Sequence, residues 1–250
     1  MLDKEGLFKL AKIRRLAPWQ EEKRYIHAII LYSLSEFPIV AKGGTYLWFF
    51  HGLNRFSEDL DFTAEEEFAE DIVQNVGETL YLFGVSNETK IIKNDRYTFS
   101  FRIGARGPLY RVEKDTCYVY IEISRREKVL LKEMPVKLDE PLYGIPMNYL
   151  RGMSLDEVLS EKIRAITIRG TARDLYDAWY LLKKKMVKPD LNLINKKLSF
   201  YNRSFDKNVF RNKVDRIEKY WYQELKPIVI GTFPEFQEVK NEVLESIEGI

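Results

Sequence analysis

Two aspartates one residue apart are the residues of this sequence best suited to chemistry. Asp59 and Asp61 lie in the segment RFSEDLDF, where acidic and apolar residues alternate. This period of two predicts a strand over residues 58–63, with both carboxylates on one face and Leu60 and Phe62 on the other. Two carboxylates about 7 Å apart on one face repel each other unless a cation lies between them. Mg²⁺ is the natural candidate, because it takes hard oxygen ligands and is held by one or two carboxylates together with substrate phosphates.

A glycine-rich turn precedes this pair in the chain. Gly43, Gly44 and Thr45 follow a strand predicted over residues 37–41 and precede a helix predicted over residues 46–51. Glycines let the backbone come close to a ligand, and a helix N-terminus presents free N–H groups to a phosphate. Taken alone, a D-x-D pair or a Gly-Gly turn is usually only surface structure. Their succession indicates phosphoryl chemistry.

The elements that must position these groups follow from periodicity and turn residues. From residue 154 onward the apolar spacing becomes helical. We therefore predict an α+β fold with a mixed sheet (an α/β front) in residues 1–150 and a mostly helical part in residues 151–250, with the proline-spaced stretch 135–146 as the seam. Helices are predicted over residues 18–36 and 65–83, the second with an acidic start, and further strands over residues 90–92, 96–103 and 117–124.

Composition limits the class of protein. The 250 residues are 45% hydrophobic with a net charge of +2, which suits a globular chain and gives no general argument for nucleic acid binding. The single Cys117 excludes an internal disulfide framework, and two histidines argue against a His-rich metal site or a His-based triad. No secretory signal and no apolar run near the roughly 20 residues of a membrane span are present. We expect a soluble, cytoplasmic protein with no membrane partner.

Three separated segments, taken in order, resemble a known family. KGGT at 42–45, RFSEDLDF at 55–62 and EKIRAITIRGTARDLYDAW at 161–179 are similar to motifs of the AbiEii/AbiGii-type nucleotidyltransferase toxins. This family is a branch of the DNA polymerase beta-like nucleotidyltransferase superfamily. The segment EKRYIHAIILYSL at 22–34 also resembles the helix ahead of the glycine motif, so the resemblance covers roughly residues 20–185. It implies a nucleotidyltransferase-like core and a metal-dependent transfer of a nucleoside monophosphate from an NTP, with release of pyrophosphate.

The resemblance also assigns the metal carboxylates and the phosphate-facing turn. In the wider superfamily a third carboxylate comes from a later strand, and Glu122 in YVYIEIS is the candidate here, although the family more often has aspartate there. Two Mg²⁺ ions would then activate the acceptor hydroxyl and steady the leaving pyrophosphate. The residues matched are Asp59 and Asp61 as carboxylates, and Gly43, Gly44, Thr45 and Ser57 as the phosphate cradle.

A second group of charged residues lies in the predicted helical part. Lys162 and Arg169 stand seven residues apart, so both can point to one side of a helix and offset triphosphate charge. Lys162 matches the lysine of the family motif, and Arg173, Asp174 and Asp177 match its R-D-x-x-D. A structural interpretation stays open for this motif. Asp174 can cap a helix, and Arg173 with Asp177 can form an ordinary i, i+4 ion pair.

Several functional alternatives remain at this point. The resemblance implies a toxin of a toxin–antitoxin or abortive-infection system with a separately encoded antitoxin, and RNA, such as a tRNA 3′ end, as the acceptor. An NTP-binding interaction module with little turnover and a metal-dependent nuclease are the rival hypotheses. Of the two histidines, His27 is predicted to pack on its helix or lie at the surface, and His51 is close enough to the glycine turn to approach a ligand.

Overall fold

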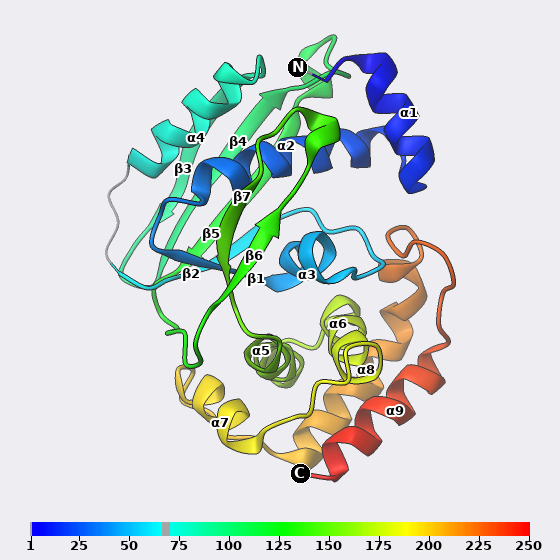
Figure 1. Cartoon of the computed structure of the whole chain (residues 1–250). Coiled ribbons are helices and arrows are strands. Elements are labelled where there is room, and N and C mark those ends of the chain that lie inside the picture. The colour runs from blue at the N-terminus through cyan, green and yellow to red at the C-terminus, as the bar shows by residue number, and fades with distance from the viewer. Residues whose placement is uncertain (1, 67–70) are drawn as a thin grey trace. The chain divides into compact units, whose positions relative to one another are not determined.

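The chain folds into two compact units in the computed structural model, which describes residues 2–66 and 71–250 (Figure 1). Unit 1 contains the strands, and unit 2 is mostly helical. The division into domains at residue 150 stays a prediction, because compactness alone does not show that a part folds independently. Unit 1 comprises Met1–Gly52, Phe56–Val129 and Glu133–Gly152, and unit 2 comprises Leu53–Arg55, Leu130–Lys132 and Met153–Ile250.

Unit 1 is built on one mixed sheet, which has seven strands within the described residues, in the order β3-β4-β5-β2-β1-β7-β6. The pairs β2–β5 and β1–β7 are parallel, and the other pairs are antiparallel. A mixed sheet accompanied by helices confirms the predicted α+β class. The strands are β1 (Ile39–Lys42), β2 (Leu60–Ala64), β3 (Ser86–Asn94), β4 (Thr98–Arg106), β5 (Cys117–Ser124), β6 (Met134–Leu138) and β7 (Asn148–Gly152).

Helices cover one face of strands β3, β4 and β5, and Figure 1 shows α2 and α4 lying over these strands. A Cβ atom added at Gly77 of α4 would lie 3.2 Å from the side chains of Asn87 and Thr89 on β3, so this helix packs closely on the sheet. The inward side chains, such as Phe101 and Ile121, are fully buried. The described helices of unit 1 are α1 (Lys4–Arg14), α2 (Pro18–Leu34), α3 (Gly43–His51), α4 (Asp71–Leu82) and the short 3₁₀ helices η1 (Glu113–Asp115) and η2 (Pro141–Tyr143).

Several elements of unit 1 begin or end differently from the predictions. Helix α3 begins at Gly43, so the two glycines form its first turn instead of a turn before it. Helix α4 begins at Asp71, whereas residues 65 and 66 form a bend, and the part of the prediction at residues 67–70 lies outside the described residues. The proline-spaced stretch 135–146 is not a seam, because it carries β6 and η2 and leads into β7, which pairs with β1.

Unit 2 consists of helices joined to two short segments from earlier in the chain. Helix α5 packs on α6 and α7, and α6 also packs on α8 and α9. Ser154 and Thr171 cap the N-termini of α5 and α6, where their hydroxyls accept from the N–H groups of Glu157 and Asp174. The helices are α5 (Leu155–Ile168), α6 (Ala172–Lys183), α7 (Leu191–Ser199), α8 (Lys207–Leu225) and α9 (Phe236–Glu248).

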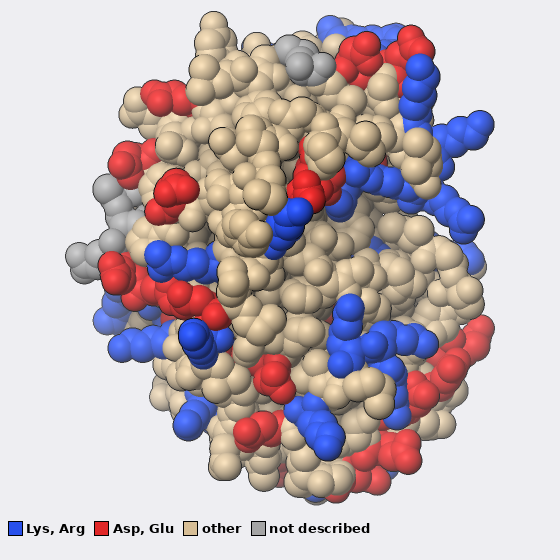
Figure 2. Space-filling view, viewed as in Figure 1, with Lys and Arg blue, Asp and Glu red and all other residues tan. Residues whose placement is uncertain are grey.

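The surface charge of the chain is mixed. On the face drawn in Figure 2, Lys and Arg side chains are interspersed with Asp and Glu, in keeping with the net charge of +2. No helix in the described part of the chain is both long enough and apolar enough to cross a membrane.

Candidate active site

The parallel pairing of β2 with β5 brings two predicted metal carboxylates together. The register pairs the Cα atom of Asp61 with that of Glu122, and neighbouring strands lie about 4.8 Å apart. Both side chains point to the face of the sheet opposite the core, since Leu60 and Phe62 beside Asp61 are buried. This confirms the predicted alternation of carboxylate and apolar side chains, although β2 begins one residue after Asp59.

The carboxylate of Asp61 lies against the first turn of α3. A Cβ atom added at Gly43 would be 2.4 Å from Oδ2 of Asp61, and the φ angle of Gly43 is +78°. Both the close approach and the left-handed backbone therefore require glycine at this position. The first N–H groups of α3 have no acceptor within the helix, and the helix dipole adds positive potential there. This end of α3 is suited to a phosphate oxygen when a cation offsets the charge of the Asp61 carboxylate.

Two side chains hold the backbone on either side of Asp59. The hydroxyl of Thr45 donates to the carbonyl oxygen of Asp59 at 2.5 Å, and Nε2 of His27 lies 2.9 Å from the carbonyl oxygen of Glu58. Burial, assisted by the positive charge of Lys23, lowers the pKa of His27 to about 3, so the imidazole is neutral at pH 7. Because a carbonyl only accepts, Nε2 carries the hydrogen. Two consecutive carbonyls are thus fixed next to the predicted metal ligand.

The predicted site residues of unit 1 differ in their exposure to solvent. Ser57 is half-buried, and Asp59 and Glu122 are exposed. Sequence reasoning gave no role to Lys42, which is the register partner of Asp61 and forms a buried ion pair with Glu127 at 2.8 Å. Among the described residues no three His, Cys, Asp or Glu side chains already converge on a metal-binding position.

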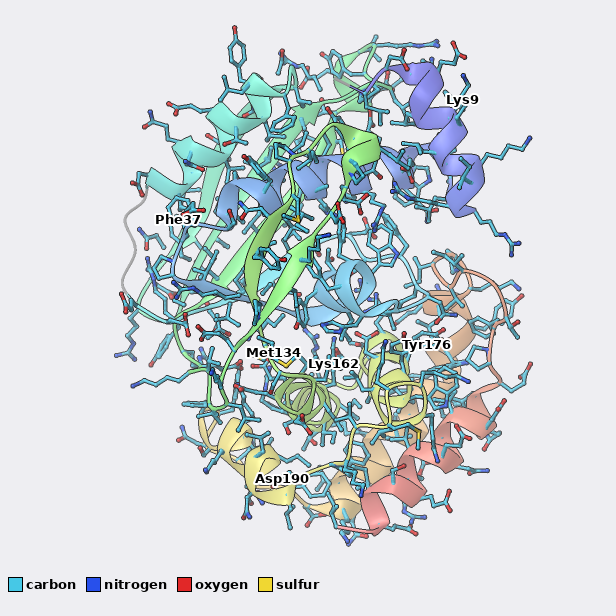
Figure 3. The ribbon with its side chains drawn as sticks, viewed as in Figure 1. Lys9, Phe37, Met134, Lys162, Tyr176 and Asp190 are labelled. Atoms are coloured by element: carbon cyan, nitrogen blue, oxygen red, sulfur yellow. The ribbon has the colours of Figure 1, made fainter. Side chains whose placement is uncertain are left out.

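Unit 2 contains a second cluster of charged side chains, which lies between α5 and α6. Nζ of Lys162 lies 2.7 Å from Oδ2 of Asp177 and 3.1 Å from Oδ1 of Asp174. Arg55 contacts both oxygens of Asp177 at 2.6 Å. Arg169 contacts both oxygens of Asp174, at 2.8 and 3.1 Å. Figure 3 labels Lys162 on α5 and Tyr176 on α6, the two helices that carry most of this cluster.

The charged state of this cluster follows from its pairing. Burial lowers the pKa of Lys162, but the carboxylates of Asp177 and Asp174 outweigh burial and hold it above the usual lysine value. Burial likewise acts against the charge of Arg55, and Asp177 reverses the effect. Burial raises the pKa of Asp174, but Lys162 and Arg169 hold it well below its usual range. Lys162 and Arg55 are therefore cationic at pH 7, and Asp174 is anionic.

Known proteins are similar to this chain over most of its length. Residues 32–242 match the family described as "Nucleotidyl transferase AbiEii toxin, Type IV TA system". The chain belongs to the AbiEii family. The predicted resemblance is confirmed, and the protein is a nucleotidyltransferase of the toxin–antitoxin type.

Solved structures share the fold of this AbiEii protein. JHP933 from Helicobacter pylori is 20% identical, with a TM-score of 0.65 over 92% of this chain and 90% of that chain. MenT4, a nucleotidyltransferase toxin from Mycobacterium tuberculosis H37Rv, is also 20% identical, with a TM-score of 0.60 over 98% of this chain and 88% of that chain. No curated protein matches the sequence at a significant level.

The R-D-x-x-D segment of this AbiEii protein differs in part from the sequence-based alternatives. The predicted ion pair between Arg173 and Asp177 does not form, because Arg173 is exposed whereas Asp177 is buried against Arg55 and Lys162. The N-cap of α6 is Thr171, whose hydroxyl accepts from the N–H of Asp174. The carboxylate of Asp174 accepts from that hydroxyl and pairs with Lys162 and Arg169. Arg55 was missed as a member of the cluster, since its partner is 122 residues away in the chain.

Proposed function

We propose that this protein transfers a nucleoside monophosphate from an NTP to an RNA acceptor and releases pyrophosphate, with Mg²⁺ as the metal. The observation that carries the proposal is the pairing of Asp61 with Glu122 on parallel strands, with the Asp61 carboxylate against the glycine turn of α3. A carboxylate pair for a metal and a helix N-terminus for phosphate thus adjoin on one side of unit 1. This is the combination that phosphoryl transfer requires.

The residues of this face suit a hard divalent cation. The side chains of Asp59, Asp61 and Glu122 offer only oxygen ligands. Mg²⁺ bound there would offset the charge of the triphosphate and lower the pKa of the attacking hydroxyl. The hydrogen bonds from Thr45 and His27 fix the backbone that carries Asp59, so this ligand needs little reorganisation.

The transfer itself is a single displacement at the α-phosphorus. The oxygen of an acceptor hydroxyl forms a bond to the α-phosphorus, while the bond from this phosphorus to the α–β bridging oxygen breaks. Pyrophosphate leaves with the electron pair, and a carboxylate of the site accepts the proton of the hydroxyl. In this scheme the N–H groups of Gly43, Gly44 and Thr45 and the hydroxyl of Ser57 bind phosphate oxygens.

For the cluster of unit 2 we propose a role in presenting a cation. The side chain of Arg169 is 64% exposed although it pairs with Asp174, whereas Lys162 and Asp177 are buried. Lys162 contacts both Asp177 and Asp174, and Asp174 orients the exposed guanidinium of Arg169, whose positive charge would offset that of a phosphate. Arg173 is exposed at the start of α6 and is the second cation of this motif open to a nucleotide.

The same proposal sets the cellular context. A Type IV toxin–antitoxin family carries a separately encoded antitoxin, and NTPs and RNA are found in the cytoplasm. We therefore expect the protein to act in the cytoplasm, with an antitoxin that limits its activity and a tRNA 3′ end among its candidate acceptors.

The test is a labelling reaction with matched variants. The wild type, Asp61→Asn and Glu122→Gln are incubated with Mg²⁺, each α-labelled NTP in turn and total tRNA, and products are separated on a denaturing gel. Glu78→Gln is the control, because Glu78 is an exposed carboxylate on α4, outside the proposed site. We expect label on RNA with the wild type and the control, and a loss of at least about 100-fold with the two site variants.

Two results would contradict the proposal. NTP binding without label on RNA, on protein or on a small product would favour the binding-module alternative. Shortening of the RNA that depends on Asp61 and Glu122 but not on NTP would favour the nuclease alternative.

A further inference from the structure

We propose that the open face of strands β3, β4 and β5 binds the single-stranded end of the RNA acceptor through Tyr118, Tyr120, Arg102 and Lys90. These four residues are called the tyrosine platform below. The inference rests on the proposed function in one respect, which is that the acceptor is RNA. The binding itself can be measured without any turnover.

The two tyrosine rings are exposed on the face opposite the described helices α2 and α4. Tyr118 is 40% exposed and Tyr120 is 46% exposed. Val119, which lies between them, and Ile121, which follows Tyr120, are fully buried. The helices α2 and α4 pack against the buried side (Figure 1). Large aromatic side chains that alternate with core residues and stay in solvent are available for stacking.

The ring of Tyr118 lies down on the sheet. Its register partner on β4 is Gly104, and a Cβ atom added there would be 3.1 Å from Cε1 of Tyr118. The guanidinium carbon of Arg102 lies 4.4 Å from the centroid of the same ring. The glycine thus leaves room for the ring, and the arginine holds one of its faces. A ring fixed in this way loses little conformational entropy when a base stacks on it.

The platform carries two cations, Lys90 and Arg102. Lys90 is the register partner of Arg102, so both side chains project from the open face. The neighbouring cations pair with acids, Lys93 with Asp95 and Arg106 with Glu88. Within the described residues, no carboxylate lies within ion-pair distance of Lys90 or Arg102. Two such cations beside exposed rings complement a phosphate backbone that carries bases.

The platform adjoins the carboxylates of the proposed site. Tyr118, Tyr120 and Glu122 alternate along β5 and share its open face, so the rings begin about 7 Å from Glu122 along the strand. A strand of RNA whose terminal hydroxyl is at Asp61 and Glu122 would pass over Tyr120 and then Tyr118. Duplex RNA buries its base faces, so stacking on these rings selects unpaired nucleotides.

The test is direct binding of a fluorescein-labelled, mixed-sequence single-stranded oligoribonucleotide, followed by anisotropy, with no NTP present. We expect Tyr118→Ala and Tyr120→Ala each to weaken binding by about 5- to 100-fold, the range for removal of one stacked base. The double variant Lys90→Gln, Arg102→Gln should reduce the dependence of log affinity on log salt concentration by about 0.7 for each phosphate that the variant no longer neutralises. Tyr81→Ala is the matched control, since Tyr81 is an exposed tyrosine on α4 and should bind RNA as the wild type does.

Transfer assays with the same variants separate this inference from the proposed function. We expect the KM for RNA to rise in the tyrosine variants while the KM for NTP stays constant.

Equal RNA affinity in the wild type and both tyrosine variants, with normal melting temperatures, would overturn the platform even if nucleotidyl transfer is observed. RNA binding that depends on the rings, in a protein that transfers no nucleotide, would support the platform and refute the proposed function. Tighter binding of a blunt duplex than of the single strand, or loss of antitoxin binding but not RNA binding, would also overturn it.

Discussion

Arg55 and Asp177 form a two-point ion pair inside unit 2 although they are 122 residues apart in the chain. Both contacts measure 2.6 Å, and the residues are 2% and 0% exposed. Lys162 approaches the same carboxylate at 2.7 Å. The pair attaches the short segment Leu53–Arg55 to helix α6, and this segment directly precedes the sequence that carries Asp59 and Asp61.

Removal of this pair should be costly for stability. We expect Arg55→Ala to lower the free energy of unfolding by about 3–5 kcal/mol, because Asp177 would keep a buried charge with only Lys162 beside it. Urea denaturation followed by circular dichroism measures the change. Arg173→Ala is the matched control, because Arg173 is exposed, and it should change stability by no more than about 0.5 kcal/mol. An equal loss of stability in Arg55→Ala and Arg173→Ala would show that the buried ion pair contributes no more to stability than an exposed arginine does.

The parts of the fold that sequence reasoning anticipated are those that local sequence signals determine. The predicted strand at residues 117–124 coincides with β5, and the helix predicted from residue 18 coincides with α2 up to its last turn. In β5 buried and exposed side chains alternate, as the period of a strand predicts. Helix α2 is instead buried without a break from Tyr25 to Leu31, and its start at Pro18 is the local signal that was correct. The alternation of carboxylate and buried apolar residues around Asp61 was correct for the same reason as that in β5.

The parts that were missed depend on tertiary packing. Glycines disfavour helix, so a turn is predicted at Gly43 and Gly44, whereas α3 begins at Gly43, whose φ of +78° favours glycine. No local pattern shows that β2 pairs in parallel with β5, and that pairing alone brings Glu122 beside Asp61. The choice of Arg55 over Arg173 as the partner of Asp177 is likewise set by contacts distant in sequence.

The contact between Gly43 and Asp61 can be tested with two glycine variants. Gly43→Ala would bring a Cβ atom within 2.4 Å of Oδ2 of Asp61, so the carboxylate has to move. Gly144 also has a positive φ, +70°, but an added Cβ there meets nothing within 4 Å. We expect both variants to lose about 1–2 kcal/mol of stability from backbone strain, and only Gly43→Ala to lose nucleotidyl transfer, by about 100-fold. Equal activity of the two variants would contradict a role for this contact.

His27 should make the stability of the folded chain sensitive to mild acid. Its pKa is about 3 in the folded state, where burial keeps it neutral, and 6.5 is the ordinary value. Between pH 3 and pH 6.5 the unfolded chain binds a proton at His27 that the folded chain does not. The stability that the neutral imidazole contributes is therefore present above pH 6.5 and is lost as the pH falls. We expect the wild type to lose about 2 kcal/mol more than His27→Gln between pH 7 and pH 5. Urea midpoints at the two pH values give the comparison, and parallel losses would show that His27 does not control it. The amide of Gln can still donate a hydrogen bond to the carbonyl of Glu58, so loss of that bond does not explain a difference between the two proteins. His51 is present in both proteins and does not explain one either.

Variants of Thr45 distinguish whether its side chain positions a metal ligand or binds the triphosphate. Its hydroxyl donates to the carbonyl of Asp59, so its side chain should position a metal ligand and not bind the triphosphate directly. Thr45→Val keeps the shape and removes the donor. We expect kcat to fall by about 10- to 100-fold with the KM for NTP unchanged, because a small displacement of Asp59 slows the chemical step. Thr45→Ser retains the hydroxyl and should restore most of kcat. A higher KM for NTP with normal kcat in Thr45→Val would instead assign the hydroxyl to phosphate binding, and failure of Thr45→Ser to restore activity would mean that the methyl group matters more than the hydrogen bond.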